Sequence, residues 1–225
     1  MGLGSRPIIY YTLRYSGADN VLKNMVNYIT DRSSKEEVLG GFEPLIQKWF
    51  NEKFEDLTPP QAMAVPLISK GKNVLVSSPT GSGKTLTAFL SILNDFLRIH
   101  KEGDLETGVH AIYISPLKAL ANDIDRNLKQ PLHEMIELAA KRKIDIPDVK
   151  VAVRSGDTSL KERARMVRKP PHILLTTPES LGLLLSSKKF RAHFRKTKYI
   201  ILDDIHDIAN NKRGTHLSLS VERLA

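Results

Sequence analysis

The residues best suited to chemistry stand in one short loop, Ser78-Pro79-Thr80-Gly81-Ser82-Gly83-Lys84-Thr85. Its glycines let backbone N–H groups turn toward an anion, and a helix that begins near Gly83 directs the positive end of its dipole there. The Lys84 ammonium can reach the β- and γ-phosphates of a nucleotide, and the Thr85 hydroxyl can ligate Mg²⁺. The pattern therefore predicts a phosphate-binding P-loop. Ser78 departs from the strict pattern, which begins with Gly, and an ordinary Gly-rich turn that opens a helix is the alternative.

A pair of carboxylates follows a second apolar run, in Ile200-Ile201-Leu202-Asp203-Asp204-Ile205-His206. An acid at the end of a buried strand can hold Mg²⁺, and we assign this role to Asp203. A second acid beside it can orient or deprotonate an attacking water, and we assign this role to Asp204. The alternative is structural, with Asp204 capping a helix N-terminus.

The elements that must position these residues alternate between strand and helix. Apolar runs predict strands, each followed by a helical pattern, at residues 73–78, 109–115, 149–154, 172–176 and 198–203. This order indicates an α/β fold, a mostly parallel sheet with helices on both faces. Ligands of such sheets bind at the carboxyl ends of the strands, where both motifs fall. A further strand is possible near residues 8–13.

The composition narrows the function classes. There is no cysteine, which excludes disulfides and thiol catalysis. No apolar run approaches the ~20 residues of a membrane span, and no signal peptide opens the chain, so we expect an intracellular protein without a membrane partner. The formal charge of +9 is concentrated, with ten bases against four acids at residues 141–169 and six bases without an acid at 188–198. Such blocks suit a polyanion, although a solvated surface is the simpler explanation.

A family resemblance emerges once a third segment is added. Thr58-Pro59-Pro60-Gln61, the P-loop and Asp203-Asp204-Ile205-His206 resemble motifs Q, I and II of superfamily two helicases. Ser115-Pro116-Leu117-Lys118 and Thr176-Thr177-Pro178-Glu179 look like motifs Ia and Ib. Residues 209–224 and 48–54 are most similar to the large helicase-related (Lhr) family. The resemblance covers residues 42–225, and it implies a first RecA-like domain there, preceded by an N-terminal extension at residues 1–41.

The resemblance implies roles for individual residues. Gln61 is expected to bind the adenine edge of ATP, Asp203 the Mg²⁺ ion, and His206 to couple this site to the neighbouring motif. Single-stranded nucleic acid, DNA rather than RNA, is the expected partner, together with a second RecA-like domain. The residues expected along the strand are Pro116, Lys118, Arg154, Gly156, Thr177 and Glu179. Ordinary loop chemistry is the alternative for each of them, with Thr177 as a helix cap.

Two departures from the family pattern keep other functions open. The family usually carries Glu at the position of Asp204, and the next motif, Ser-Ala-Thr, does not follow before Ala225. One rival function is a P-loop small-molecule phosphotransferase, which has no need of Gln61 or of motifs Ia and Ib. The other is a nucleotide- and nucleic-acid-binding module that does not hydrolyse ATP.

Overall fold

The computed structural model describes residues 8–12, 27–79, 81–103, 105–116 and 124–224. Within these ranges a single sheet of six strands has the order β2-β1-β6-β3-β5-β4, and every pair of neighbours is parallel. Its strands are β1 (Ile8–Thr12), β2 (Val74–Ser77), β3 (Ala111–Ile114), β4 (Val151–Arg154), β5 (Ile173–Thr176) and β6 (Tyr199–Leu202). The fold class expected from the sequence is confirmed.

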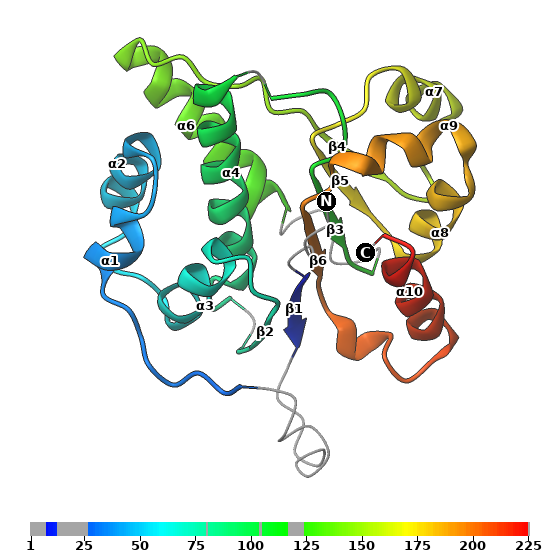
Figure 1. Ribbon diagram of the computed structural model, residues 1–225, viewed down its shortest axis with the longest axis horizontal. Coiled ribbons are helices and arrows are strands. Elements are labelled where there is room, and N and C mark those ends of the chain that lie inside the picture. The colour runs from blue at the N-terminus through cyan, green and yellow to red at the C-terminus, as the bar shows by residue number, and fades with distance from the viewer. Residues whose placement is uncertain (1–7, 13–26, 80, 104, 117–123, 225) are drawn as a thin grey trace.

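The α-helices connect these strands and cover the sheet on two sides (Figure 1). Those on the side of α4 are α1 (Lys35–Gly40), α2 (Pro44–Lys53), α3 (Pro59–Ser69), α4 (Lys84–Glu102) and α6 (Gln130–Arg142). Those on the opposite side are α7 (Leu160–Arg168), α8 (Pro178–Ser186), α9 (Lys188–Arg191) and α10 (Lys212–Glu222). Short turns of other helix types are η1 (Asp125–Lys129), η2 (Ala192–Lys196) and η3 (Ile205–Asp207).

The apolar run of strand β3 packs against the helical layers on both faces of the sheet. Ala111 and Tyr113 belong to the core on the α4 side, whereas Ile112 and Ile114 belong to the core on the α8 side. All four residues are buried, as expected for a strand between two helical layers. Successive side chains of a strand point to opposite faces, so an unbroken apolar run supplies two cores at once.

The N-terminal strand is part of the sheet rather than an appendage beside it. Ile8–Thr12 pairs with β2 on one side and with β6 on the other. Helix α1 also joins the domain core through Val38 and Leu39. The strand expected near residues 8–13 is therefore present, and the two elements that the structure describes before residue 42 pack against the rest of the domain.

Candidate nucleotide-binding site

The functional segments meet at one edge of the sheet. Because all paired strands run parallel, their carboxyl ends lie on the same side. The P-loop follows β2, Pro116 follows β3, Ser155 and Gly156 follow β4, Thr177 follows β5 and Asp203 follows β6. We call this side of the domain the carboxyl edge.

The P-loop has the backbone form that phosphate binding requires. Gly81 and Gly83 have φ values of 79° and 87°, a region in which residues with a side chain are strained. Gly83 directly precedes α4, whose first N–H groups have no acceptor within the helix. The Lys84 ammonium donates to the carbonyl oxygens of Ser78 at 2.8 Å and Pro79 at 2.9 Å, which folds it back over the loop. Amides and a cation thus converge on one place.

The start of α3 packs against this loop. The Gln61 side chain is 2% exposed, and its Oε1 accepts from the Thr58 amide at 2.9 Å. A β-carbon on Gly83 would lie 2.9 Å from Thr58 Oγ1 and 3.2 Å from Gln61 Nε2. Thr58 Oγ1 is buried and has no hydrogen-bond partner among the described residues. Gln61 therefore lies beside the P-loop, as the motif predicts, while its contact with adenine stays a prediction.

Asp203 occupies a buried position at the end of β6. It is 5% exposed, and it accepts a hydrogen bond from the Tyr113 hydroxyl. Burial raises the pKa of Asp203, and the neighbouring Asp204 charge raises it further, whereas Tyr113 and the Lys84 ammonium act in the opposite direction. Lys84 and Asp203 follow β2 and β6, whose carboxyl ends lie at the same edge of the sheet, so the two motifs belong to one region of the surface. Tyr113 belongs to no recognisable motif, and its position beside Asp203 follows from the pairing of β3 with β6.

Asp204, the residue after Asp203, has a backbone conformation that is uncommon for residues other than glycine. Its φ and ψ of 50° and 39° are left-handed, and its amide donates to Asp203 Oδ1 at 3.0 Å. Asp204 stands before η3, yet its side chain makes no capping hydrogen bond to that turn. The capping alternative thus finds no support in the geometry. His206 lies in η3 with its Nε2 3.3 Å from Asp207 Oδ1.

Two arginines gather at the end of β4. Arg154 is 8% exposed, and its guanidinium donates to the Ser155 carbonyl at 2.6 Å. Arg163 from α7 donates to the carbonyls of Gly156 and Thr158, each at 2.7 Å. Burial lowers the pKa of Arg154, and repulsion from Arg163 adds to this effect. Within the described ranges neither arginine pairs with a carboxylate, so this corner of the carboxyl edge favours an anion. Arg163 was not among the predicted residues.

The remaining predicted residues have different surroundings. Thr177 caps α8, because its Oγ1 accepts from the Ser180 amide at 3.3 Å. Glu179 accepts from Arg213 Nε at 2.5 Å, so its carboxylate already has a cationic partner. Pro116 is half-buried directly after β3. Thr80 and Lys118 lie outside the described residues.

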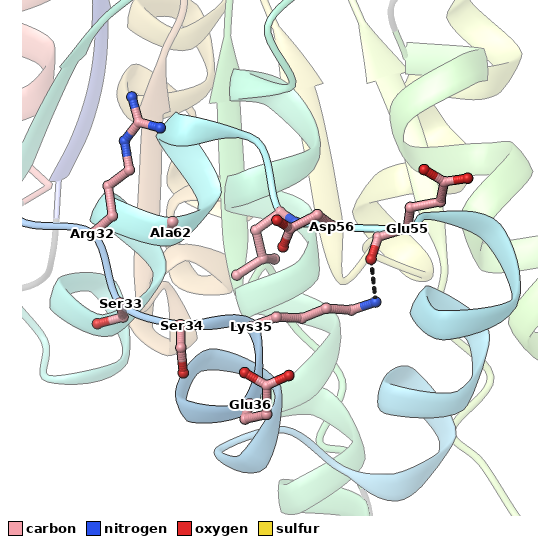
Figure 2. Close-up of a pocket in the computed structure, with 9 residues that line it drawn as sticks. Arg32, Ser33, Ser34, Lys35, Glu36, Glu55, Asp56 and Ala62 are labelled. Atoms are coloured by element: carbon pink, nitrogen blue, oxygen red, sulfur yellow. Dashed lines mark hydrogen bonds between the residues drawn. The ribbon is translucent and has the colours of Figure 1, made fainter.

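A hollow of about 490 Å³ lies beside α3, between residues 32–36 and 55–57 (Figure 2). Lys35 crosses it and donates to the Glu55 carbonyl at 2.8 Å. The side chains that line it carry charges of both signs, those of Arg32 and Lys35 and those of Glu36, Glu55 and Asp56. The hollow consequently lacks the one-sided potential that selects an anion.

Two features are absent from the described ranges. None of their helices combines the length and apolarity needed to span a membrane. No group of three or more His, Asp or Glu side chains is arranged there to hold a metal. A Mg²⁺ site needs no such group, since Mg²⁺ is usually held by one or two carboxylates, waters and substrate phosphates.

The fold and the convergence of Lys84 with Asp203 at the carboxyl edge define the chain as a RecA-like P-loop domain. The family model described as "DEAD/DEAH box helicase" matches residues 58–225. The chain therefore belongs to the DEAD/DEAH box helicase family.

Relatives support the narrower resemblance to Lhr. The chain is 50% identical over 200 residues to ATP-dependent helicase Lhr-Core protein 2 of Thermococcus barophilus, covering 89% of the chain and 23% of that relative. It is 53% identical over 188 residues to ATP-dependent helicase Lhr-Core of Methanothermobacter thermautotrophicus, covering 84% and 22%. The chain thus spans less than a quarter of the length of these relatives.

A solved structure agrees with both findings. The Lhr helicase of Mycobacterium smegmatis, bound to ssDNA and AMP-PNP, superposes with a TM-score of 0.75 at 44% identity. The superposition covers 83% of this chain and 23% of that one.

Proposed function

We propose that this chain is the ATP-binding motor domain of a helicase that couples ATP hydrolysis to movement along single-stranded nucleic acid, with DNA favoured over RNA. The observation that carries the proposal is the convergence of a P-loop lysine and a buried acid at one edge of the sheet. The relatives named as ATP-dependent helicases and the Lhr neighbour bound to ssDNA and AMP-PNP support it.

The residues present fit ATP and Mg²⁺. The loop amides, Pro79, Thr80, Ser82 and the two left-handed glycines would surround the phosphates, and Gln61 would contact the adenine. Thr85 and Asp203 would hold Mg²⁺, which neutralises phosphate charge when bound. Lys84 would exchange its two carbonyl acceptors for phosphate oxygens. Asp204 would orient the attacking water and accept its proton, and His206 would transmit the state of this site to the adjoining motif.

The nucleic-acid strand would follow the carboxyl edge. Arg154 and Arg163 offer guanidinium groups without a carboxylate partner in the described ranges, which suits a phosphate. Pro116, Lys118, Gly156, Thr177 and Glu179 would lie along the same path. Contacts with phosphates through such groups position a strand without reading its sequence.

The test of nucleotide binding is Lys84→Ala, measured by calorimetry with a non-hydrolysable ATP analogue and Mg²⁺. Loss of charge-assisted hydrogen bonds to phosphate is expected to weaken binding at least about tenfold. Lys72→Ala removes an exposed lysine before β2 and serves as the matched control. Equal affinity of the Lys84 variant and the wild type would refute the nucleotide site.

A second measurement separates the three functions considered. Stimulation of ATP turnover by single-stranded DNA supports the motor. Phosphate transfer to a small acceptor supports a phosphotransferase, and tight binding without turnover, even with both RecA-like domains present, supports a binding module.

A further inference from the structure

A strongly basic surface lies at the opposite edge of the sheet from the site described above. We call it the amino-edge basic surface, and it consists of Arg168 and Lys169 at the end of α7, Lys188, Lys189 and Arg191 of α9, and Arg195 of η2. All six side chains are exposed, and none forms an ion pair with a residue of the described ranges. The fold therefore does not use these charges to hold itself together.

Backbone contacts fix the location of this surface. The Val109 amide, which precedes β3, donates to the His193 carbonyl at 3.0 Å, so η2 lies at the amino ends of the strands. His193 Nε2 lies 3.0 Å from the Val167 carbonyl, which brings η2 against the end of α7. In Figure 1, α7 and α9 both lie toward the top of the right-hand helical layer, whereas α10 lies toward its bottom. The basic block at residues 188–198 consequently does not join the predicted strand-contacting residues.

Helix electrostatics do not account for the cluster. A base in the last turn of a helix is stabilised by the helix dipole, but this effect fades beyond that turn. The dipole of α7 stabilises the basic residues at its end. Helix α9 has only four residues and hence a small dipole, and the basic residues of α9 and η2 belong to a segment without any acid. Six exposed like charges repel one another, and a polyanion removes that repulsion.

The side chains of the surface favour a duplex over a single strand. Proteins that bind single strands usually combine basic side chains with exposed aromatic rings, on which the nucleobases stack. The aromatic residues of this segment, Phe190 and Phe194, are buried in the core at 2% and 4% exposure. A surface of Lys and Arg side chains without exposed rings suits the phosphate backbone of a duplex, whose nucleobases are already paired.

We infer that the amino-edge basic surface binds the phosphate backbone of duplex DNA, a duplex continuous with the single strand proposed for the carboxyl edge. Helix α8 joins the two edges, since it is capped by Thr177 and followed by Ser187, the cap of α9. Its nine residues span about 14 Å at 1.5 Å each, roughly the length of four nucleotides of one strand. One DNA molecule with a duplex and a single-stranded tail can therefore reach both edges. The contact with the single-stranded tail rests on the proposed function, whereas the contact with the duplex does not depend on it.

The test compares two variants that each lose three charges. Lys188→Gln, Lys189→Gln and Arg191→Gln are combined in one, and Lys141→Gln, Arg142→Gln and Lys143→Asn in the control, whose bases are equally exposed on the other side of the sheet. Binding of a blunt duplex to the 225-residue chain is followed by fluorescence anisotropy over a range of salt, without nucleotide. The α9 variant is expected to lower the slope of log K against log salt by about 2 to 3, as three lost phosphate contacts predict. The control is expected to leave this slope unchanged.

A charge-retaining variant, Lys188→Arg with Lys189→Arg and Arg191→Lys, is expected to bind the duplex as the wild type does. Equal slopes for the α9 variant and the control would overturn the inference. So would a loss of affinity for a single strand as large as the loss for the duplex, or a synthetic acidic polypeptide that competes as well as DNA. Failure of the proposed function would appear elsewhere, as unchanged nucleotide affinity in Lys84→Ala.

Discussion

Asp204 combines a left-handed backbone with a position beside the buried Asp203, and both features bear on its role. Asp and Asn tolerate the left-handed region better than most residues because their short polar side chains bond locally. The Asp at this position, where the family usually has Glu, therefore agrees with a φ of 50°. The same geometry makes Asn a fitting probe, because it retains the size and the backbone preference but cannot accept a proton.

We predict that Asp204→Asn in the full-length protein abolishes ATP hydrolysis and spares ATP binding. Steady-state phosphate release and analogue affinity measure the two effects. Asp204→Glu introduces the longer side chain that the family usually has at this position, so ATP turnover is expected to be retained. Glu lacks the local hydrogen bonding by which a short Asp side chain stabilises the left-handed backbone. Near-normal turnover by the Asn variant would leave Asp203 as the only functional acid of the pair.

His172 predicts how stability depends on pH. It is 5% exposed, its ring centroid lies 5.9 Å from that of His110, and its Nδ1 accepts from the Lys150 amide at 3.0 Å. Burial, aided by His110 and Lys150 and opposed by Asp148, lowers the pKa of His172 from 6.5 to about 4. The neutral form is thus favoured in the folded state, and protonation removes the acceptor for Lys150.

The free energy of unfolding is therefore expected to be fully retained above pH 6.5 and to fall as the pH drops toward 4, by up to about 3 kcal/mol. Urea unfolding at a series of pH values measures this loss. His172→Asn, which keeps an acceptor near Nδ1 but does not titrate, is expected to flatten the dependence in this range. An unchanged pH profile in that variant would exclude His172 as its source.

At the scale of elements, the two P-loop glycines differ in what surrounds them. A β-carbon on Gly81 meets open space, whereas one on Gly83 would lie 2.9 Å from the buried Thr58 Oγ1. Ala at either position costs roughly 1–2 kcal/mol of left-handed strain. At Gly83 the start of α3 must also shift.

We predict that Gly83→Ala weakens nucleotide binding more than Gly81→Ala, because of the two new β-carbons the one at Gly83 would press against Thr58 and Gln61. Calorimetry and urea unfolding of both variants test this. Gly81→Asn, which tolerates the left-handed region, is the control and should stay close to the wild type. An identical loss of affinity at both glycines would show that strain alone matters and that the α3 contact does not.

The same scale shows what the sequence can and cannot predict. Strands β3, β5 and β6 fall inside the expected ranges, since a strand buried on both faces is an unbroken apolar run. Helix α8 begins directly after Thr177, the residue offered as a helix cap, because Thr177 and Pro178 are recognisable start signals. The short helices α1 and α9 were not anticipated, because four to six residues carry too little periodicity to be seen.

Contacts between elements that are distant in the chain could not be predicted from the sequence either. The hydrogen bond from Tyr113 to Asp203 and the bonds from Arg163 to the loop after β4 depend on strand order and helix placement. The place of Ile8–Thr12 between β2 and β6 is likewise a long-range pairing that local pattern does not encode. The motifs thus indicated which residues gather at the carboxyl edge but not which side chains support them.

At the scale of the whole molecule, the resemblance implies that a second RecA-like domain completes the site. Such a domain supplies an arginine that stabilises the transition state, worth about 10³ or more in rate among P-loop enzymes. We predict that the 225-residue chain binds ATP but turns it over at about a thousandth or less of the rate of the full-length protein, and unwinds nothing. Phosphate release and strand displacement measure this. Robust unwinding by the 225-residue chain would contradict the two-domain site.

The folded-back Lys84 has a consequence for the thermodynamics of binding. A free lysine side chain loses up to about 2 kcal/mol of rotamer entropy when it is fixed. Lys84 is already held by the Ser78 and Pro79 carbonyls, so this loss occurs during folding rather than when the nucleotide arrives. Binding then exchanges neutral acceptors for charged ones, a change felt mainly as enthalpy. The loop consequently acts as a preorganised receptor, whose selectivity for phosphate depends on the strength of the new acceptors rather than on ordering the side chain.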